Sequence, residues 1–143
     1  MATVQDMIRK KGAEIFSISP SASALEALKL LEKHNMGAAL VMEGGEVKGI
    51  LSERDCVRKL ELAGKQAKDT QVGEIMTEKV ITIEAEEDLE ACMSLMLEKN
   101  IRHLPVYSGG KLKGLISVRD VLREVVEAQK SMIAQLEQYI GGR

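Results

Sequence analysis

Two stretches of the sequence decide the fold because they repeat one pattern. Residues 42–55 read MEGGEVKGILSERD, and residues 107–120 read YSGGKLKGLISVRD. The spacing of 65 residues holds back to Ile15 over Val80 without a gap, and 12 of the 46 aligned positions from Ile15 to Leu60 are identical. Such a match at constant spacing is typical of an internal repeat. The chain is therefore two copies of one supersecondary unit.

The repeat extends upstream with a change of spacing. Val4–Ile8 echoes Val72–Met76, so the first copy has three additional residues around Arg9–Glu14. A single copy of about 60 residues buries little surface, so we expect the two copies to pack together as one body. The predicted divisions are a first copy over residues 1–65 with core 15–60, a second copy over 72–128 with core 80–125, and a C-terminal extension over 129–143.

Each copy has the same predicted order of elements: strand, helix, strand, strand, helix. The short apolar stretches Ile15–Ile18 and Val80–Ile83 are typical of strands. Ser23, followed three residues later by Glu26, predicts a capping box at the start of the next helix. Asp88 is the matching N-cap in the second copy.

Local signals also mark the helix ends and the hairpins. Asn35 and Asn100 end the first helix of each copy, because Asn tolerates the left-handed conformation. Gly-Gly pairs at 44–45 and 109–110 predict tight hairpins. Ser52 and Ser117 then open the last helix of each copy. Apolar residues at helical spacing predict the buried helix faces: Leu25, Leu28, Leu31, Met93 and Leu97.

Composition excludes several classes of protein. The 143 residues are 45% hydrophobic and 29% charged, with a net charge of −2 and only three aromatic residues. We therefore expect no nucleic-acid partner, since there is no basic excess and there are few aromatic rings to stack on bases. No apolar run reaches the ~20 residues of a membrane span, and the N-terminus has no signal-peptide pattern. We expect a cytoplasmic protein with reduced thiols.

The residues shared by the two copies support two interpretations. Ser52 with Asp55, and Ser117 with Asp120, are typical of helix capping, which explains serine and aspartate by themselves. Arg54 and its repeat equivalent are not explained by capping, because a cation in the first turn opposes the helix dipole. An arginine, an aspartate and free backbone amides at a helix start are also the groups that a ribose-phosphate site requires.

The duplicated Gly-apolar-apolar-Ser-x-x-Asp pattern after a Gly-Gly hairpin, with His103–Val106 before the second hairpin, resembles the cystathionine-β-synthase (CBS) domain. The similarity covers Val4 to about Val126. Two such domains in tandem resemble a Bateman module, as in small stand-alone prokaryotic CBS-pair proteins. The resemblance implies an α/β (α+β) fold of two βαββα units, related by a pseudo-twofold axis and packed as one module, here with an extended C-terminal helix.

The resemblance also implies a function and a set of ligand-binding residues. It implies a regulatory module that binds AMP, ADP, ATP, NAD or S-adenosylmethionine in clefts between the repeats, with the aspartates on the ribose and the serines near the ribose-phosphate. The first copy departs from the family pattern at Ala38–Leu40. The candidate ligand-binding residues are Ser17, Met36, Gly37, Ala38, Ser52, Arg54 and Asp55 in the first copy, and Thr82, Asn100, Ile101, Arg102, His103, Leu104, Pro105, Ser117, Arg119 and Asp120 in the second.

The two predicted clefts differ. Arg102 and His103 precede the second strand of copy two, where copy one has Gly37 and Ala38. Two additional donors favour phosphate binding, so we expect copy two to be the better phosphate site.

We predict no catalysis, no catalytic cofactor and no metal. Neither copy places a histidine base near its serine, and nucleophilic catalysis needs such a base. Cys56 and Cys92 fall on apolar helix positions and are expected to be buried small hydrophobes. His34 is expected to be solvated, whereas His103 is either structural or a ligand contact. The open alternatives are an interaction or oligomerisation module with vestigial clefts, and a metal or RNA sensor.

The sequence also predicts a homodimer or larger assembly, with an unknown regulated protein as a further partner. After Asp120 the helical pattern continues to about Tyr139. Leu122, Val125, Met132, Leu136 and Tyr139 recur at steps typical of a coiled-coil seam, interrupted by Gln129. Packing of this helix on its own domain is the alternative. The repeats themselves can also pair across a dimer axis, as CBS modules do.

Overall fold

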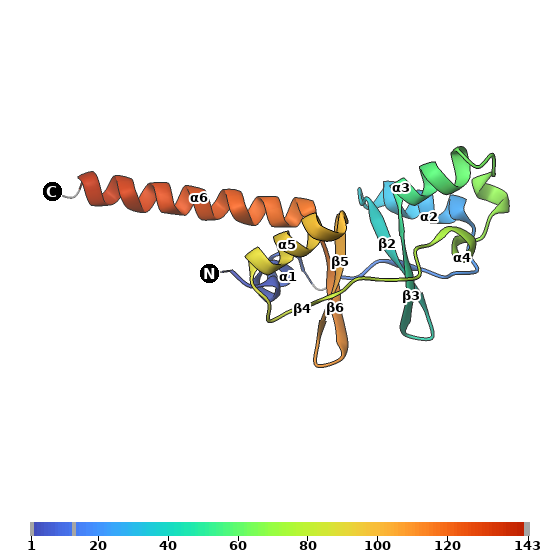
Figure 1. Ribbon diagram of the computed structural model, residues 1–143, viewed down its shortest axis with the longest axis horizontal. Coiled ribbons are helices and arrows are strands. Elements are labelled where there is room, and N and C mark those ends of the chain that lie inside the picture. The colour runs from blue at the N-terminus through green and yellow to red at the C-terminus, as the bar shows by residue number, and fades with distance from the viewer. Residues whose placement is uncertain (1, 13, 142–143) are drawn as a thin grey trace. The chain divides into compact units, whose positions relative to one another are not determined.

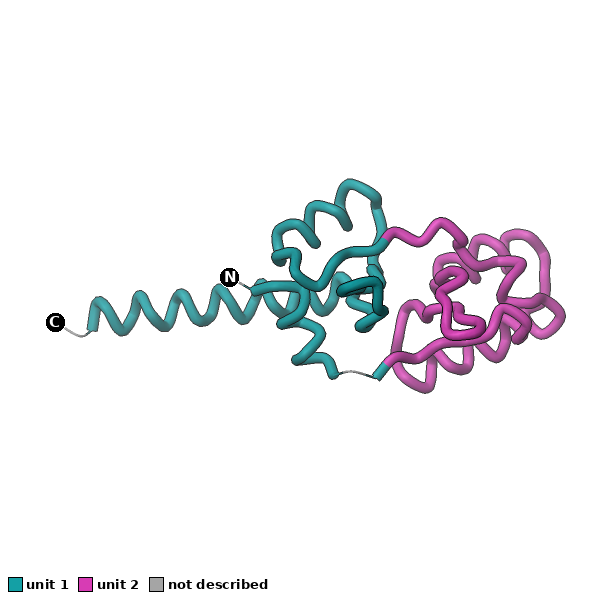
Figure 2. Tube along the Cα trace, turned by 90° about the horizontal axis from the view of Figure 1, so that it is seen from below, with its two compact units in different colours: residues 1–14, 82–143 teal, residues 15–81 magenta. Residues whose placement is uncertain are grey.

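The computed structural model describes residues 2–12 and 14–141 and divides into two compact units. Unit 1 contains residues 1–14 and 82–143, and unit 2 contains residues 15–81 (Figure 2). Residues 1, 13 and 142–143 lie outside the described part of the chain. Residues 1 and 142–143 are the ends of the predicted divisions, and residue 13 falls in the three-residue insertion predicted around Arg9–Glu14.

Unit 2 is built on a three-stranded sheet of order β1-β2-β3. The first pair of strands is parallel and the second is antiparallel. Its elements in chain order are β1 (Ser17–Ile18), α2 (Ala24–Lys33), β2 (Ala38–Glu43), β3 (Glu46–Ser52), α3 (Glu53–Cys56), η1 (Val57–Glu61), η2 (Ala67–Asp69) and α4 (Val72–Ile75) (Figure 1).

Unit 1 repeats this plan with a sheet of order β4-β5-β6. The pairing is again parallel, then antiparallel. Its elements are α1 (Val4–Lys11), β4 (Ile83–Glu84), α5 (Leu89–Lys99), β5 (His103–Ser108), β6 (Lys111–Ser117) and α6 (Val118–Gly141). The mixed α/β class, the order of elements in each repeat and the long C-terminal helix are thus as predicted.

The hairpin glycines adopt the conformation that their turns require. Gly44 and Gly45 have φ of 60° and 79°, and Gly109 and Gly110 have φ of 57° and 78°. Two successive positive φ values are typical of a type I′ turn, which suits the twist of an antiparallel hairpin. Asn35 and Asn100 also have positive φ, 51° and 52°, as predicted for the helix ends.

Several local predictions are corrected. The first strands are shorter than predicted, so Thr82 lies just before β4 rather than within a strand. Ser23 accepts a hydrogen bond from the Glu26 amide at 3.1 Å, which is one half of the predicted capping box. His34 is half-buried rather than solvated, because its ring stacks on Phe16 with 3.7 Å between the centroids.

The helix that precedes each repeat in the sequence packs with the other repeat. The amides of Val4 and Gln5 in α1 donate to the carbonyls of Glu87 and Ala85, both at 2.9 Å. Likewise, α4 precedes the second repeat but packs with the first: its Val72 amide donates to the Ala22 carbonyl of unit 2 at 2.8 Å. The compact units therefore differ from the continuous divisions of the sequence: residues 1–14 join the second repeat, and residues 66–81 join the first.

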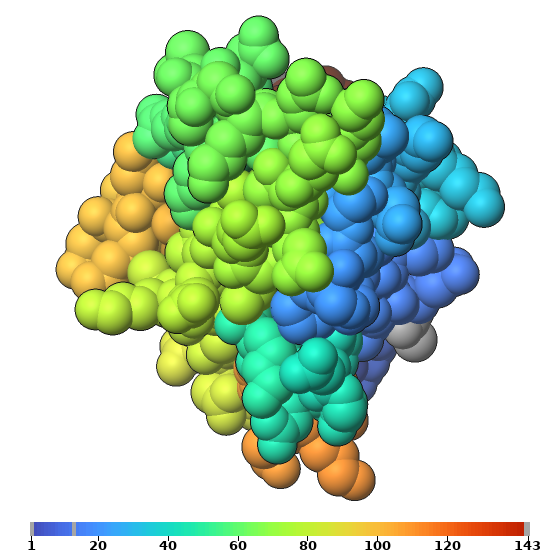
Figure 3. Space-filling view, turned by 90° about the vertical axis from the view of Figure 1, so that its right-hand side faces the viewer, coloured from blue at the N-terminus to red at the C-terminus, as the bar shows by residue number. Residues whose placement is uncertain are grey.

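The start of α4 lies directly against the start of α2. The Ala24 amide donates to the Thr70 carbonyl, and the Gly73 amide to the Pro20 carbonyl, both at 2.8 Å. In Figure 3 the blue segment near residue 20 and the yellow-green segment near residue 70 form one continuous surface. The segment between the two predicted copies, residues 66–71, is thus anchored within unit 2.

One glycine in the last strand of each sheet allows the neighbouring helical segment to come close. A Cβ at Gly49 would lie 2.7 Å from the Thr77 carbonyl oxygen, and one at Gly114 would lie 2.8 Å from Cδ1 of Ile8. The obstacle at Gly49 is backbone and cannot move easily, whereas at Gly114 it is the end of the Ile8 side chain. This close approach brings the chain after α4 and the C-terminal part of α1 to the edges of the two sheets.

The cores are aliphatic, as the composition predicts. In unit 2 a buried cluster forms from Ala24, Ala27, Val41, Leu51, Cys56, Leu60, Val72 and Ile75. The predicted helix faces are only partly correct: Leu31 is buried, but Leu25 is 37% and Leu97 81% exposed. In α5 the core is instead contacted by Cys92 and Met96, which shifts the buried face by one residue.

The last helix, α6, begins in the core of unit 1 and then leaves it. Val121 and Glu124 are buried in its first two turns, and the helix continues well beyond the other elements of the unit (Figure 1). From position 126 to 141 every residue is exposed. Among the described residues, no helix combines the length and the apolar character needed to cross a membrane.

Candidate functional site

In unit 2 the candidate site begins at the start of α3. The Asp55 amide donates to Ser52 Oγ at 3.0 Å, and the Ser52 amide donates to Asp55 Oδ2 at 3.0 Å. This reciprocal pair is a complete capping box. The capping interpretation of Ser52 and Asp55 is therefore confirmed.

Asp55 has further partners that hold its carboxylate in place. Thr77 Oγ1 donates to its two oxygens at 3.3 and 3.4 Å, and Lys59 Nζ lies 3.2 Å from Oδ1. Lys59 also donates to the Ile75 carbonyl at 3.1 Å. The carboxylate is only 14% exposed, so its orientation is fixed by these contacts.

The start of α6 in unit 1 has the same arrangement. The Ser117 amide donates to Asp120 Oδ2 at 2.8 Å, and the Asp120 amide donates to Ser117 Oγ at 3.3 Å. Ser117 Oγ also donates to Oδ2 at 3.1 Å. Capping is thus confirmed for this pair as well, and both repeats present a fixed carboxylate at a helix start.

The Asp120 carboxylate differs from Asp55 in its cationic partner. Lys11, the last residue of α1, donates to Oδ2 at 2.9 Å and to the Leu115 carbonyl at 2.7 Å. Burial by itself raises the pKa of Asp120, but the Lys11 ammonium and the Ser117 amide outweigh it and lower the pKa below its ordinary value. Asp120 is therefore ionised at neutral pH.

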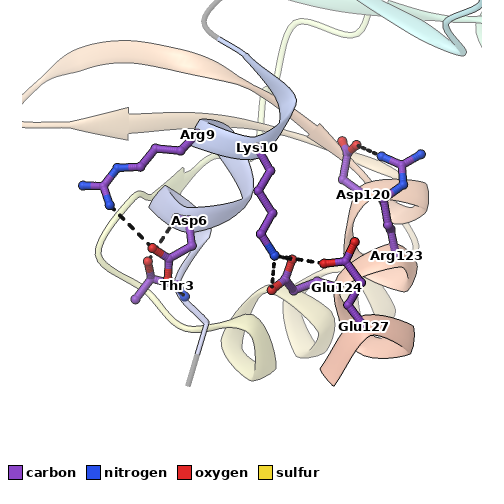
Figure 4. A network of polar contacts seen from close by, with 8 residues as sticks. All are labelled: Thr3, Asp6, Arg9, Lys10, Asp120, Arg123, Glu124 and Glu127. Atoms are coloured by element: carbon purple, nitrogen blue, oxygen red, sulfur yellow. Dashed lines mark hydrogen bonds and ion pairs between the residues drawn. The ribbon is translucent and has the colours of Figure 1, made fainter. Parts of the chain in front are cut away.

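Neighbouring cations tie the end of α1 to α6 (Figure 4). Lys10 Nζ lies 2.9 Å from Glu124 Oε2 and 3.0 Å from Glu127 Oε2. On α6 itself, Arg123 lies 3.7 Å from Asp120 Oδ1. The two consecutive lysines thus bind three acids on successive turns of α6.

His103 is the cross-strand partner of Ser117, which corrects the prediction that no histidine lies near either serine. Burial lowers the pKa of His103 to about 4, with Lys11 and Arg102 adding to the shift and Asp120 opposing it. The ring is therefore neutral at pH 7. Ser117 Oγ donates to Asp120 and not to the imidazole, so His103 does not activate it as a nucleophile.

The residues before β2 and β5 meet the helix starts through their backbones. The Glu53 amide donates to the Gly37 carbonyl, and the Val118 amide to the Arg102 carbonyl, both at 2.9 Å. Strand register also pairs Ala38 with Ser52. In each unit, the segment before the second strand of the sheet and the start of the following helix therefore lie together, as two parts of one predicted site.

Other predicted residues differ in how accessible they are. Met36, Gly37 and Ile101 are half-buried, whereas Ala38, Leu104 and Pro105 are buried and present no accessible side chain. The exposed candidates are Ser17, Arg54, Thr82, Asn100, Arg102 and Arg119. In the described part of the chain, none of the three arginines in this set pairs with a carboxylate.

Sequence reasoning missed three residues of these sites: Lys11, Lys59 and Thr77. Lys59 follows Asp55 by four residues, so helical i,i+4 spacing was a usable signal. Thr77 and Lys11 are brought in by α4 and α1, and no local pattern connects them to the aspartates.

The described residues contain no cluster of three or more His, Cys, Asp or Glu side chains that could hold a metal ion. Cys56 and Cys92 are buried, as predicted. Burial raises the pKa of each thiol to about 11, and nearby Asp55 and Glu53 add to the shift at Cys56. Both thiols are therefore protonated at neutral pH and are poor metal ligands.

Comparison with known proteins agrees with this geometry. The family model of the CBS domain matches residues 4–62 and again residues 72–127. The chain belongs to the CBS domain family. The two matches coincide with the two sequence repeats.

Several known CBS proteins are similar along most of the chain. A CBS domain-containing protein from Arabidopsis thaliana, named CBSX3, mitochondrial, is 35% identical, over 98% of this chain and 72% of its own length. A solved structure of a CBS-domain protein from Burkholderia ambifaria MC40-6 is 39% identical with a TM-score of 0.86, over 90% of this chain and 96% of its own.

A second solved structure contains ligands. The CBS domain pair of protein MJ0100, in complex with 5′-methylthioadenosine and S-adenosyl-L-methionine, is 25% identical with a TM-score of 0.78. The match covers 90% of this chain and 98% of that one.

Proposed function

We propose that this CBS pair is a regulatory module that binds adenine-containing ligands without transforming them. One site is centred on Asp55 and the other on Asp120. The observation that carries the proposal is the duplicated carboxylate, held at a helix start by a serine in both repeats. The adenosine derivatives bound by the MJ0100 domain pair support the same class of ligand.

The carboxylates suit the two hydroxyls of a ribose. An ionised carboxylate accepts hydrogen bonds at both oxygens, and a charged acceptor strengthens them. Asp120 Oδ1 has one partner among the described residues, Arg123 at 3.7 Å, which is beyond hydrogen-bond distance. This oxygen is therefore available to a hydroxyl donor.

A second function, self-association, is favoured by α6. Its exposed stretch carries Met132 (63% exposed), Leu136 (56%) and Tyr139 (82%) along one side. Apolar residues at this spacing are typical of a helix that packs against another helix. The occupant that we propose is α6 of a second copy, giving a homodimer.

A cytoplasmic location of the protein stays a prediction.

The test is a ligand panel on the full chain. AMP, ADP, ATP, NAD and S-adenosylmethionine are added at millimolar concentration, and the melting temperature is measured. A ligand at 100 times its Kd stabilises the fold by about 2.7 kcal/mol. No shift with any of the five would contradict the proposal, and product formation detected by chromatography would contradict its non-catalytic part.

Variants assign the sites. Asp55→Asn and Asp120→Asn each keep an oxygen to accept the serine amide, but they remove the charge that favours the ribose hydroxyls. Calorimetry is expected to show the loss of one site in each variant. Asp69→Asn, an exposed acid in η2, is the matched control and is expected to bind like the parent.

A further inference from the structure

Lys11 reaches the carboxylate that the proposed function assigns to the ribose in unit 1. Its Nζ contacts Asp120 Oδ2 and the Leu115 carbonyl, at 2.9 and 2.7 Å. An ammonium has three donors, and these contacts use two of them. The Lys11 side chain is 40% exposed and that of Asp120 is 11% exposed, so the lysine is the more accessible member of the pair.

The Oδ2 atom of Asp120 has too many donors to accept a ribose as it stands. Lys11 Nζ, the Ser117 amide and Ser117 Oγ all point to it, at 2.9, 2.8 and 3.1 Å. A carboxylate oxygen offers about two lone pairs. A ribose diol that uses both carboxylate oxygens must therefore displace a donor from Oδ2.

Lys11 is the donor that can leave. The Ser117 amide is fixed by the backbone at the junction of β6 and α6, whereas a lysine ammonium sits on a flexible four-carbon stem. Once it is displaced, the ammonium has lost its counter-charge. A ligand with a 5′-phosphate supplies a new anion close to the ribose, but a nucleoside does not.

We propose that Lys11 determines specificity in unit 1 by selecting phosphorylated adenine ligands over nucleosides. In the free protein the Lys11 ammonium neutralises the Asp120 carboxylate. When the ribose hydroxyls replace the ammonium at this carboxylate, Lys11 turns to the phosphate of the ligand. This inference rests on the proposed function and adds to it a residue, Lys11, and a ligand class, nucleotides.

Unit 2 does not have an equivalent lysine. The cation at Asp55 is Lys59, which lies one turn further along the chain from Asp55 and 3.2 Å from its Oδ1. Lys11 instead approaches from the strand side, at Leu115, where the helix begins. Anions favour the N-terminal end of a helix, so of the two lysines Lys11 is the one placed to meet a phosphate. Selectivity is expected in unit 1 alone.

The experiment compares AMP with adenosine, which differ only in the phosphate. Calorimetry is done on the full chain with Asp55→Asn in the background, so that unit 1 dominates the signal. Lys11→Met is expected to weaken AMP about tenfold, the loss of one charged hydrogen bond, while adenosine binds equally well or tighter. Lys11→Arg keeps the charge and is expected to keep the preference for AMP.

Arg9→Met is the matched control, because Arg9 is on the same helix, is 72% exposed and pairs with Asp6 instead. It removes the same net charge and is expected to leave the ratio of AMP to adenosine affinity unchanged. An unaltered ratio in Lys11→Met would overturn this inference alone. If neither ligand binds the parent protein, the inference and the nucleotide function fail together.

Discussion

At the scale of single residues, Asp55 and Asp120 combine a structural and a proposed binding task. Each uses one oxygen to accept a serine amide, at 3.0 and 2.8 Å, and thereby closes the first turn of its helix. The cap orients the carboxylate before any ligand arrives. Less conformational entropy is then lost on binding, which is the energetic benefit of a preorganised site.

His103 gives a residue-scale prediction of pH dependence. Burial lowers its pKa from 6.5 in the unfolded chain to about 4 in the fold, so the folded state favours the neutral ring. Its contribution to stability is therefore complete above pH 6.5 and is lost as the pH falls towards 4. We expect this to cost on the order of 2 kcal/mol of unfolding free energy.

The measurement is chemical denaturation at pH 7, 5.5 and 4.5, comparing the parent with His103→Gln. The variant cannot protonate, so its stability is expected to fall less over this range. An identical pH slope in His103→Gln and the parent would show that the ring protonates freely in the fold.

At the scale of elements, the docking of α1 on α6 depends on Lys10. Glu124 is 9% exposed, and its two oxygens accept from Lys10 Nζ at 3.1 and 2.9 Å. The same ammonium contacts Glu127 at 3.0 Å, and the pair of acids raises the pKa of Lys10. A buried carboxylate without its partner is destabilising, whereas replacing both partners by apolar groups is often neutral.

A double-mutant cycle tests this contact. Lys10→Met is expected to lower the melting temperature, and Lys10→Met with Glu124→Leu is expected to recover most of the loss. Lys48→Met removes an exposed pair with Glu46 of the same 3.0 Å length, and it is expected to change little. Equal effects of Lys10→Met and Lys48→Met would mean that the Lys10–Glu124 contact adds nothing to the docking of α1.

Elements with local signals were predictable, and those placed by distant contacts were not. The Gly-Gly turns, the asparagine helix ends and the serine caps each depend on a few adjacent residues, and all were identified from the sequence. The exchange of α1 and α4 between repeats was not, because both helices have the same pattern and either repeat could accept either helix. Lys11 was missed for this reason: it meets Asp120 only after α1 has crossed to the other repeat.

The same distinction between local signals and distant contacts applies to the candidate site. Duplication identified Ser52, Asp55, Ser117 and Asp120, which cap their helices as expected. The pairing of His103 with Ser117 depends on the register of β5 and β6, which the residues adjacent to Ser117 do not show. The exposure of Arg54, Arg102 and Arg119 depends on where their side chains lie, and the sequence pattern does not predict this.

At the scale of the whole molecule, the exposed part of α6 needs a partner. Met132, Leu136 and Tyr139 continue the spacing of Leu122 and Val125, and residues 126–141 are exposed. Packing of this helix on its own unit, the alternative raised by the sequence, is therefore wrong for this stretch. A polar residue within such a seam, here Gln129, is a known means of setting helix register.

We expect the parent chain to be a dimer by light scattering, and Leu136→Glu to dissociate it, because the glutamate would place a charge in the apolar seam. Gln138→Glu adds the same charge on another side of the helix and is expected to leave the mass unchanged. Truncation after Val126 is expected to act like Leu136→Glu. The alternative dimer interface is on the repeats themselves, where Leu97 of α5 is 81% exposed. If Leu97→Glu dissociates the assembly while Leu136→Glu and the truncation do not, the repeats form the interface and α6 has no part in it.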